Sequence, residues 1–252
     1  MKPYNSEDLV RFCTNLAFPL AALLAAGIAV GQVPAAPAGA ANGWMKIATD
    51  LSQPETASPA IRQQRDSHFD ASPLASRVPL TPDSAPLHHV FAGAHVAGQP
   101  EIAEVSNRAV VIATFTGYRS ILTASGREVY TEVTFHVSNV FEDTAGRAVR
   151  DSDITVALRG GTVKTAGGNV ISYLTGPSPY FIQPQRTYLL VLSHHADGDF
   201  YSRAGDWDIS DGVVRANSDR ESRIAQQGKS ALVGLSKDQL VRLLNQRFST
   251  KN

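Results

Sequence analysis

Residues 129–140 read V-Y-T-E-V-T-F-H-V-S-N-V, and this stretch decides the fold class. Its odd-numbered positions up to Val137 carry apolar or β-branched side chains, whereas the positions between them, from Tyr130 to Ser138, are mostly polar. A period of two, sustained over this length and rich in β-branched and aromatic residues, is typical of a β-strand. Because one face is apolar and the other polar, the stretch predicts a half-buried strand in an antiparallel sheet.

Further strands are predicted on both sides of this stretch. They cover residues 109–118, 154–158, 187–193, 200–203, 207–210 and 213–216. Residues 109–118 are nearly all apolar and predict burial on both faces, and residues 187–193 predict a central strand. Gly160-Gly161 predicts a reversal, followed by a glycine-marked loop over residues 162–179 with a short apolar stretch at 170–174. Strands at this spacing, without helices between them, predict an antiparallel barrel or sandwich. The strand number and length favour a small OB-like barrel over residues 104–217.

The last segment, residues 218–252, is predicted to be a connector followed by an amphipathic helix at 237–248. Ser236 and Gln239 form an S-x-x-Q capping box, and Leu235 can contact Leu240 as a hydrophobic staple. The apolar stripe of this helix consists of Leu240, Leu243, Leu244 and Phe248. Such a stripe needs a partner. We expect the open end of the barrel in the same chain, with docking on another protein as the alternative.

Residues 1–40 predict a signal peptide or a membrane anchor. No charge occurs between Arg11 and Lys46, and residues 16–33 form an apolar run followed by the A-x-A pattern Ala38-Gly39-Ala40. A buried soluble helix is a third alternative. Either of the first two places the rest of the chain outside the cytoplasm: periplasmic, secreted, or anchored by this segment.

The single cysteine, Cys13, excludes an internal disulfide and a cysteine-based metal site. It precedes the apolar run, which is the wrong side for lipoprotein modification. If the segment stays in the membrane, palmitoylation of Cys13 is the alternative.

Residues 41–103 are predicted to be a disordered or loosely ordered linker. Residues 34–108 contain nine of the 14 prolines and show no lasting periodicity. Short helical turns near residues 43–49 or 58–66 are compatible with the sequence. The apolar patch at residues 87–96 is expected to dock on the barrel as an edge strand or to form a turn.

Several short patterns resemble a small extracytoplasmic barrel domain of uncharacterised bacterial secreted proteins. They are Tyr130-Thr131-x-Val133-x-Phe135-x-Val137 with Val140-Phe141, Asp153-x-Thr155-Val156 leading to Gly160-Gly161, Pro179-Tyr180-Phe181, and Arg186-x-Tyr188-Leu189-Leu190-Val191-Leu192. The resemblance covers residues 104–216. Where such domains usually carry Gly-Glu-Arg, this chain has Pro184-Gln185-Arg186. The resemblance implies a barrel outside the cytoplasm and transfers no catalytic residues.

Candidate chemistry is concentrated after the predicted central strand. The candidate metal or catalytic groups are His194, His195, Asp197, Asp199 and Asp206. Histidines and carboxylates are metal ligands, but H-H-x-D-x-D is not a known ligand spacing, and adjacent strand residues point to opposite faces. The stretch from Asp206 to Gly212 resembles a calcium loop, but it has Asp211 where an EF-hand needs glycine and Asn217 where it needs glutamate. An Asp-Gly hairpin explains it better.

No nucleophile elbow, H-E-x-x-H or P-loop occurs, so no catalytic residue, metal or cofactor is assigned. The net charge is zero, and no nucleic-acid partner is expected. The aromatic residues that could line a groove for sugars or peptides, or instead belong to the core, are Tyr118, Tyr130, Tyr173, Tyr180, Tyr188 and Trp207.

The sequence therefore favours a non-enzymatic binding or envelope-structural module with a protein or glycan partner, which touches the membrane through residues 1–40 if they are not cleaved. The alternative is a metal-dependent hydrolase assembled from loops. A protease-inhibitor-like barrel is less favoured, because such proteins normally depend on disulfides.

Overall fold

A computed structural model of the chain describes residues 49–50, 55, 57–82, 102–173, 182–217, 225–228 and 230–249. The chain divides into two compact units, residues 1–39 and 40–252, and all described residues belong to the second. The predicted signal peptide or anchor and the apolar patch at 87–96 lie outside the described residues. Within the described ranges, no helix has the length and apolar character needed to cross a membrane.

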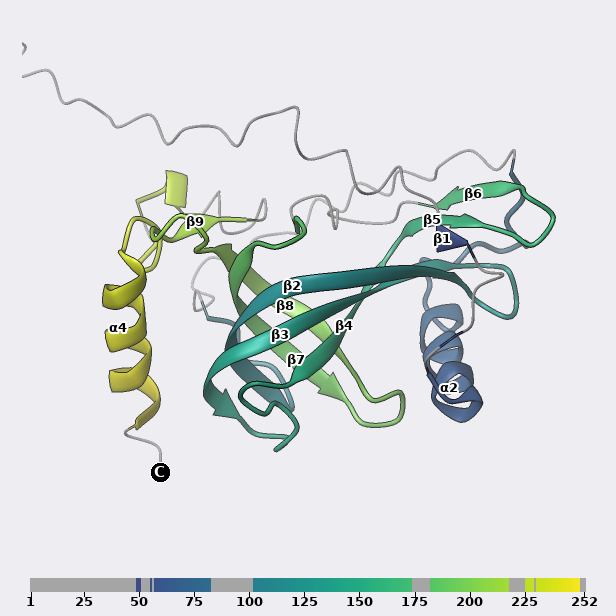
Figure 1. Cartoon of the computed structure of the whole chain (residues 1–252). Helices are drawn as coiled ribbons and strands as arrows, with labels where there is room; N and C mark the ends of the chain where they lie inside the picture. The colour runs from purple at the N-terminus through teal and green to yellow at the C-terminus, as the bar shows by residue number, and fades with distance from the viewer. Residues whose placement is uncertain are drawn as a thin grey trace, which may run out of the picture. The chain divides into compact units, whose positions relative to one another are not determined.

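The described chain is mainly β, as the sequence predicts, and its main sheet has six strands (Figure 1). They are β2 (Arg108–Leu122), β3 (Val129–Asp143), β4 (Asp153–Arg159), β7 (Thr187–His195), β8 (Phe200–Asp208) and β9 (Arg215–Ala216). Their order is β4-β3-β2-β7-β8-β9, with antiparallel neighbours throughout. In addition, β4 pairs with β8 in parallel at Val156 and Tyr201.

The strands differ from the sequence prediction mainly in length. β2, β3, β4 and β7 are confirmed and extend beyond their predicted ends. The two short strands predicted at 200–203 and 207–210 are one continuous strand, β8, because β7 supplies a hydrogen-bonding partner along its whole length. Three register shifts between β2 and β3 allow this long pair to bend: the unpaired residue is Phe141 or Ser138 of β3 at two of them and Thr116 of β2 at the third.

A second, three-stranded sheet stands where a glycine-marked loop was predicted. It consists of β1 (Thr49–Asp50), β5 (Gly161–Lys164) and β6 (Val170–Tyr173). The loop prediction is wrong at these positions because Val163, Ile171 and Tyr173 pack with Val129 and Leu80 in a small core. Strands this short lack a clear period in the sequence.

Two apolar clusters lie on opposite faces of β2 and β7. Val111 and Leu190 belong to the first cluster, which β3, β4 and Tyr201 complete. Their neighbours Val110 and Leu189 belong to the second, with Trp207 of β8. Because consecutive strand residues point to opposite sides, burial on both faces requires a cover on each.

The second cluster is covered by α4 (Lys237–Ser249), which buries Leu240, Leu244 and Phe248. The capping box is confirmed: the Ser236 N–H donates to Gln239 Oε1 at 2.8 Å, and the Gln239 N–H donates to Ser236 Oγ at 3.2 Å. The helix packs within the same chain, as expected, against this face of the sheet.

Helix α2 (Pro59–Asp70) departs from the linker interpretation of residues 41–103, which allowed only a helical turn near 58–66. Ser58 caps it, with Oγ accepting from the Ile61 N–H at 3.4 Å, and Pro59 occupies the first turn, where its missing N–H costs nothing. The sequence underestimates α2 because its buried residues, Arg65, Asp66 and Phe69, are mostly charged.

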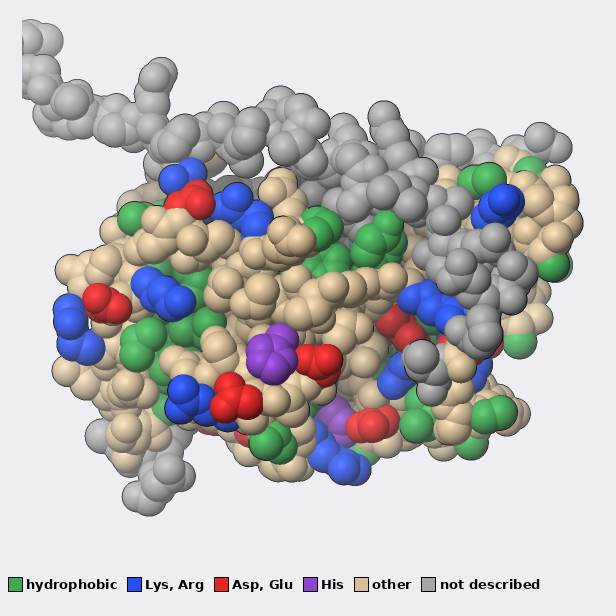
Figure 2. All heavy atoms as spheres, viewed as in Figure 1, with side chains coloured by type: hydrophobic (Ala, Val, Ile, Leu, Met, Phe, Trp, Pro, Cys, Tyr) green, Lys and Arg blue, Asp and Glu red, His purple; other side chains and the backbone are tan. Residues whose placement is uncertain are grey.

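In the view of Figure 2, acidic and basic side chains are interspersed, without a large area of one sign.

Candidate functional site

Arg65 fastens α2 to the turn between β7 and β8. The residue is only 6% exposed. Nε donates to the Gly198 carbonyl at 2.7 Å, Nη2 to the Asp199 carbonyl at 2.6 Å, and Nη1 to Glu132 Oε1 of β3 at 2.7 Å. Asp199 is held in the left-handed region at φ 45°, which a non-glycine residue rarely adopts. The guanidinium thus fixes the turn by its two carbonyls and also ties it to β3.

Two aspartates fasten α2 to the turn between β2 and β3. Asp66 accepts from the Ala124 N–H at 2.9 Å and from the Tyr130 hydroxyl at 3.1 Å. Asp70 accepts from the hydroxyls of Thr123 at 2.8 Å and Ser125 at 2.7 Å. Burial raises the pKa of Asp66, although Arg62 opposes the shift. The helix therefore joins two hairpin turns that are distant in sequence.

An aromatic cluster lies beneath α2. Phe69 stacks on Tyr130 with ring centroids 4.2 Å apart and an interplanar angle of 11°. The Arg159 guanidinium lies 5.1 Å from the Phe69 ring centroid, and Phe200 closes the cluster. Burial raises the pKa of the Tyr130 hydroxyl, which therefore stays protonated and can donate to Asp66.

Glu128, below this cluster, is a fully buried carboxyl group. Arg159 Nη1 donates to its Oε2 at 2.9 Å, while Oε1 has no hydrogen-bond partner among the described residues. Burial raises the pKa of Glu128 to about 8, and the attraction of Arg159 only partly offsets this. Burial also lowers the pKa of Arg159. Desolvation thus outweighs the ion pair, and Glu128 is largely protonated at neutral pH.

Two histidines from distant parts of the chain meet at the end of α2. The ring of His68 lies edge-on to that of His195, with centroids 4.7 Å apart. His195 also stacks on Phe200 at 4.6 Å, and its Nε2 lies 2.9 Å from Ser202 Oγ. The pKa of each imidazole is lowered, chiefly by burial, and for His195 next by His68, whereas Asp197 raises both. Both rings therefore favour the neutral form.

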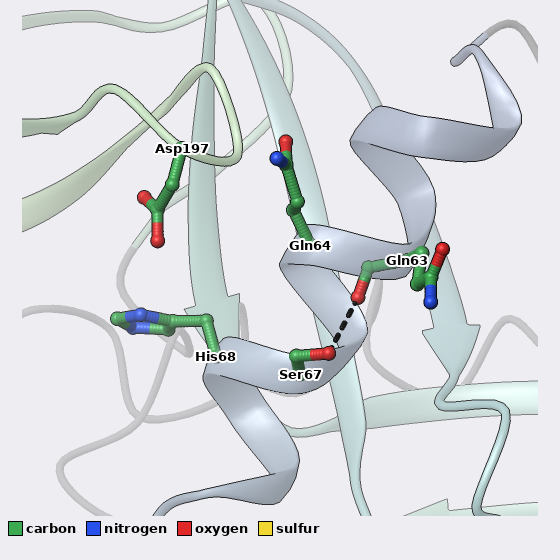
Figure 3. Close-up of a pocket in the computed structure, with 5 residues that line it drawn as sticks. All are labelled: Gln63, Gln64, Ser67, His68 and Asp197. Atoms are coloured by element: carbon green, nitrogen blue, oxygen red, sulfur yellow. Dashed lines mark hydrogen bonds between the residues drawn. The ribbon is translucent and has the colours of Figure 1, made fainter.

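A hollow of about 510 Å³ opens beside this histidine pair. Figure 3 shows its lining: Gln63, Gln64, Ser67 and His68 of α2, and Asp197 of the β7–β8 turn. Ser67 Oγ donates to the Gln63 carbonyl at 2.8 Å, so its lone pairs stay available to a ligand. The described residues that line the hollow present amides, a hydroxyl, an imidazole and a carboxylate, and none of them is a lysine or arginine.

The five candidate residues of the sequence are distributed over three places. Asp197 lines the hollow, and the ring of His195 contacts the ring of His68, which also lines it. His194 points to the other side of β7, as strand geometry predicts; its Nε2 lies 3.3 Å from Asp199 Oδ1, and its ring centroid lies 4.9 Å from that of Tyr201. Asp206 is buried elsewhere.

Asp206 is bound by Asn217 and by Arg203, whose Nη1 is 3.3 Å from Asp206 Oδ1. Arg186 pairs with Asp208 and Asp211 in the calcium-like stretch. The described part of the chain contains no group of three or more histidine, cysteine or acidic residues placed to hold a metal ion.

The sequence analysis assigned no functional role to the residues of α2 that line the hollow. A capping serine followed by proline at positions 58–59 was the available signal for a helix start. Comparison of the chain with protein-family models, curated proteins and solved structures gives no match. The site is therefore interpreted from its own geometry.

Proposed function

We propose that residues 104–217 form an OB-like barrel, outside the cytoplasm, that binds an uncharged glycan in the hollow between α2 and the β7–β8 turn without catalysing a reaction on it. The parallel pairing of β4 with β8 supports the barrel, because it links the first and fifth strands of the sheet order. The five strands then pair in the cyclic order β4-β3-β2-β7-β8, and OB-type barrels commonly bind oligosaccharides.

The lining of the hollow is the observation that carries the glycan proposal. Sugar hydroxyls donate and accept hydrogen bonds, and the amides of Gln63 and Gln64 can do both. The Asp197 carboxylate accepts from hydroxyls and disfavours an anionic ligand. Arg65 holds the neighbouring carbonyls of residues 198 and 199, so the turn bearing Asp197 is ordered before a ligand arrives.

The test is isothermal titration calorimetry of the full-length chain with uncharged tetrasaccharides of N-acetylglucosamine and of glucose. We expect one of them to bind. Gln64→Ala and Asp197→Asn should each weaken binding about fivefold, since a single hydrogen bond is worth about 1 kcal/mol. Gln226→Ala, at an exposed position distant in sequence, is the matched control and should bind like the wild type.

Two results would count against the proposal. One is the absence of heat with both sugars, or an affinity that Gln64→Ala and Asp197→Asn leave unchanged. The other is stoichiometric metal in the purified chain that is lost on His195→Ala, which would favour the loop-assembled hydrolase instead.

Delivery beyond the cytoplasm is part of the same proposal, and residues 1–40 are the segment proposed to direct it. N-terminal sequencing of the protein isolated from cells tests it. A start near Ala41 indicates cleavage, and an intact Met1 with membrane association indicates an anchor. A chain with intact Met1 recovered from the soluble cytoplasm would refute this part.

A further inference from the structure

Helices α2 and α4 are attached to the sheet by different chemistry. The buried residues of α4 are Leu240, Leu244 and Phe248, whereas those of α2 are Arg65, Asp66 and Phe69. Helices that belong permanently to a core bury apolar stripes, and contacts between separable parts are more polar. By this criterion α4 is a core helix, and α2 is attached in the manner of a bound partner.

The sheet is complete without α2. The two large apolar clusters on either side of β2 and β7 contain no residue from positions 57–82. None of the strand pairings of the main sheet involves that segment either. Phe69 and Leu80 enter only two smaller peripheral clusters. The two large clusters that hold the main sheet together therefore form without the segment, whereas its contacts are with the turns and the smaller clusters.

This receiving surface has a chemical pattern that matches one kind of ligand. On this surface, two turn carbonyls and a carboxylate accept hydrogen bonds from a cationic side chain. A backbone N–H and a phenol donate to one carboxylate of the helix, and two hydroxyls donate to a second. The α2-receiving surface consists of Thr123, Ala124, Ser125, Tyr130, Glu132, Gly198 and Asp199. The face of the Tyr130 ring receives a phenyl group. A helix fits this pattern when it carries Arg-Asp-x-x-Phe-Asp.

We propose that the α2-receiving surface is a docking site for a helical peptide of this pattern, and that its partner is the α2 segment of a second copy of this chain, in exchange with the copy's own. Residues 83–101 connect the segment to the sheet, and these 19 residues can span up to about 65 Å when extended. The length of the connection therefore does not prevent exchange. The proposal does not rest on glycan binding, although four of the residues that line the hollow belong to α2.

The test uses a fluorescein-labelled synthetic peptide of residues 57–82, with anisotropy as the readout. The receiving protein is the full-length chain with Arg65→Ala and Phe69→Ala, which weaken the attachment of the chain's own helix and change no residue of the α2-receiving surface. We expect this variant to bind the peptide at 1:1 stoichiometry. The wild-type chain should bind it at least about tenfold more weakly, because its own α2 competes.

Two peptide variants test the pattern. A peptide with Arg65→Ala should lose at least about tenfold in affinity, because it leaves two carbonyls and the Glu132 carboxylate without their cation. A peptide with Arg77→Ala, which removes an exposed arginine of the same segment, should bind like the unmodified peptide. Near-UV circular dichroism of the receiving variant, dominated by its aromatic core, reports whether the sheet is intact.

The proposal is overturned by any of three results. The receiving variant retains its near-UV signal but does not bind the peptide. The wild-type chain and the variant bind it equally, which places the binding elsewhere. The variant loses its near-UV signal, in which case α2 is an integral part of the fold and not an exchangeable ligand.

Discussion

Glu128 gives the sharpest stability prediction, because a fully buried carboxyl group makes the fold sensitive to alkali. Burial raises its pKa in the folded state from 4.5 to about 8. Between these two values the folded chain holds a proton that the unfolded chain has released. The free energy of unfolding therefore falls as pH rises from about 4.5, and the loss is complete only above about pH 8.

The size of the effect follows from the shift. Each unit of pKa difference corresponds to about 1.4 kcal/mol, so ionising Glu128 costs the fold on the order of 3–5 kcal/mol by pH 9. The Glu128→Gln variant keeps an acceptor for Arg159 Nη1 and cannot ionise. We expect the two proteins to differ little at pH 5 and the variant to be more stable by a few kcal/mol at pH 9.

Urea denaturation at intervals from pH 5 to pH 9, followed by circular dichroism, measures this difference directly. Burial also raises the pKa of Asp66 and lowers the pKa values of His68 and His195, so the informative quantity is the variant's stability minus the wild type's at each pH. Glu104→Gln, at an exposed position, is the matched control and should give a flat difference. A flat difference for Glu128→Gln as well would refute the reasoning.

Two further substitutions test the packing. Leu244→Ala in α4 removes a fully buried side chain and should lower the free energy of unfolding by about 2–5 kcal/mol. Leu243 is only partly buried, so Leu243→Ala should cost less than half as much. Equal losses in urea denaturation would contradict the assignment of the buried stripe. Gly161→Ala places a Cβ 2.5 Å from Thr131 Oγ1 at φ 154° and should lower the free energy of unfolding by about 3 kcal/mol or more. Gly146→Ala is the control and should cost about 1 kcal/mol, because φ is 66° there and nothing lies within 4 Å of the new Cβ. Thermal melts that rank these two glycine variants the other way would show that the hydroxyl yields to the new methyl group.

The main sheet and α4 could be predicted because their signals are local. Alternation over residues 129–140 and the apolar run at 109–118 specify strands and their buried faces. Ser236 and Gln239 mark the start of α4 within four residues. Burial on both faces of β2 also followed from composition alone, although which element covers the second face did not.

The candidate site could be predicted only in part. His195 and Asp197 were among the candidates, but their neighbours His68 and Gln64 were assigned to a linker. The helix that carries them has little apolar periodicity, because charged side chains attach it. The partners of its central arginine lie 133 and 134 residues further along the chain, and no local pattern reports such a pairing.

The sequence by itself determined the β class of this protein, the alternation of its faces and the limits of its last helix, since each depends on residues a few positions apart. Only the tertiary structure decided that α2 folds onto the sheet, that the Glu128 carboxyl group is buried against Arg159, and that His68 meets His195 while His194 turns away. These features depend on the burial of polar groups, and whether a charge is buried is a property of everything packed around it, not of its neighbours in sequence.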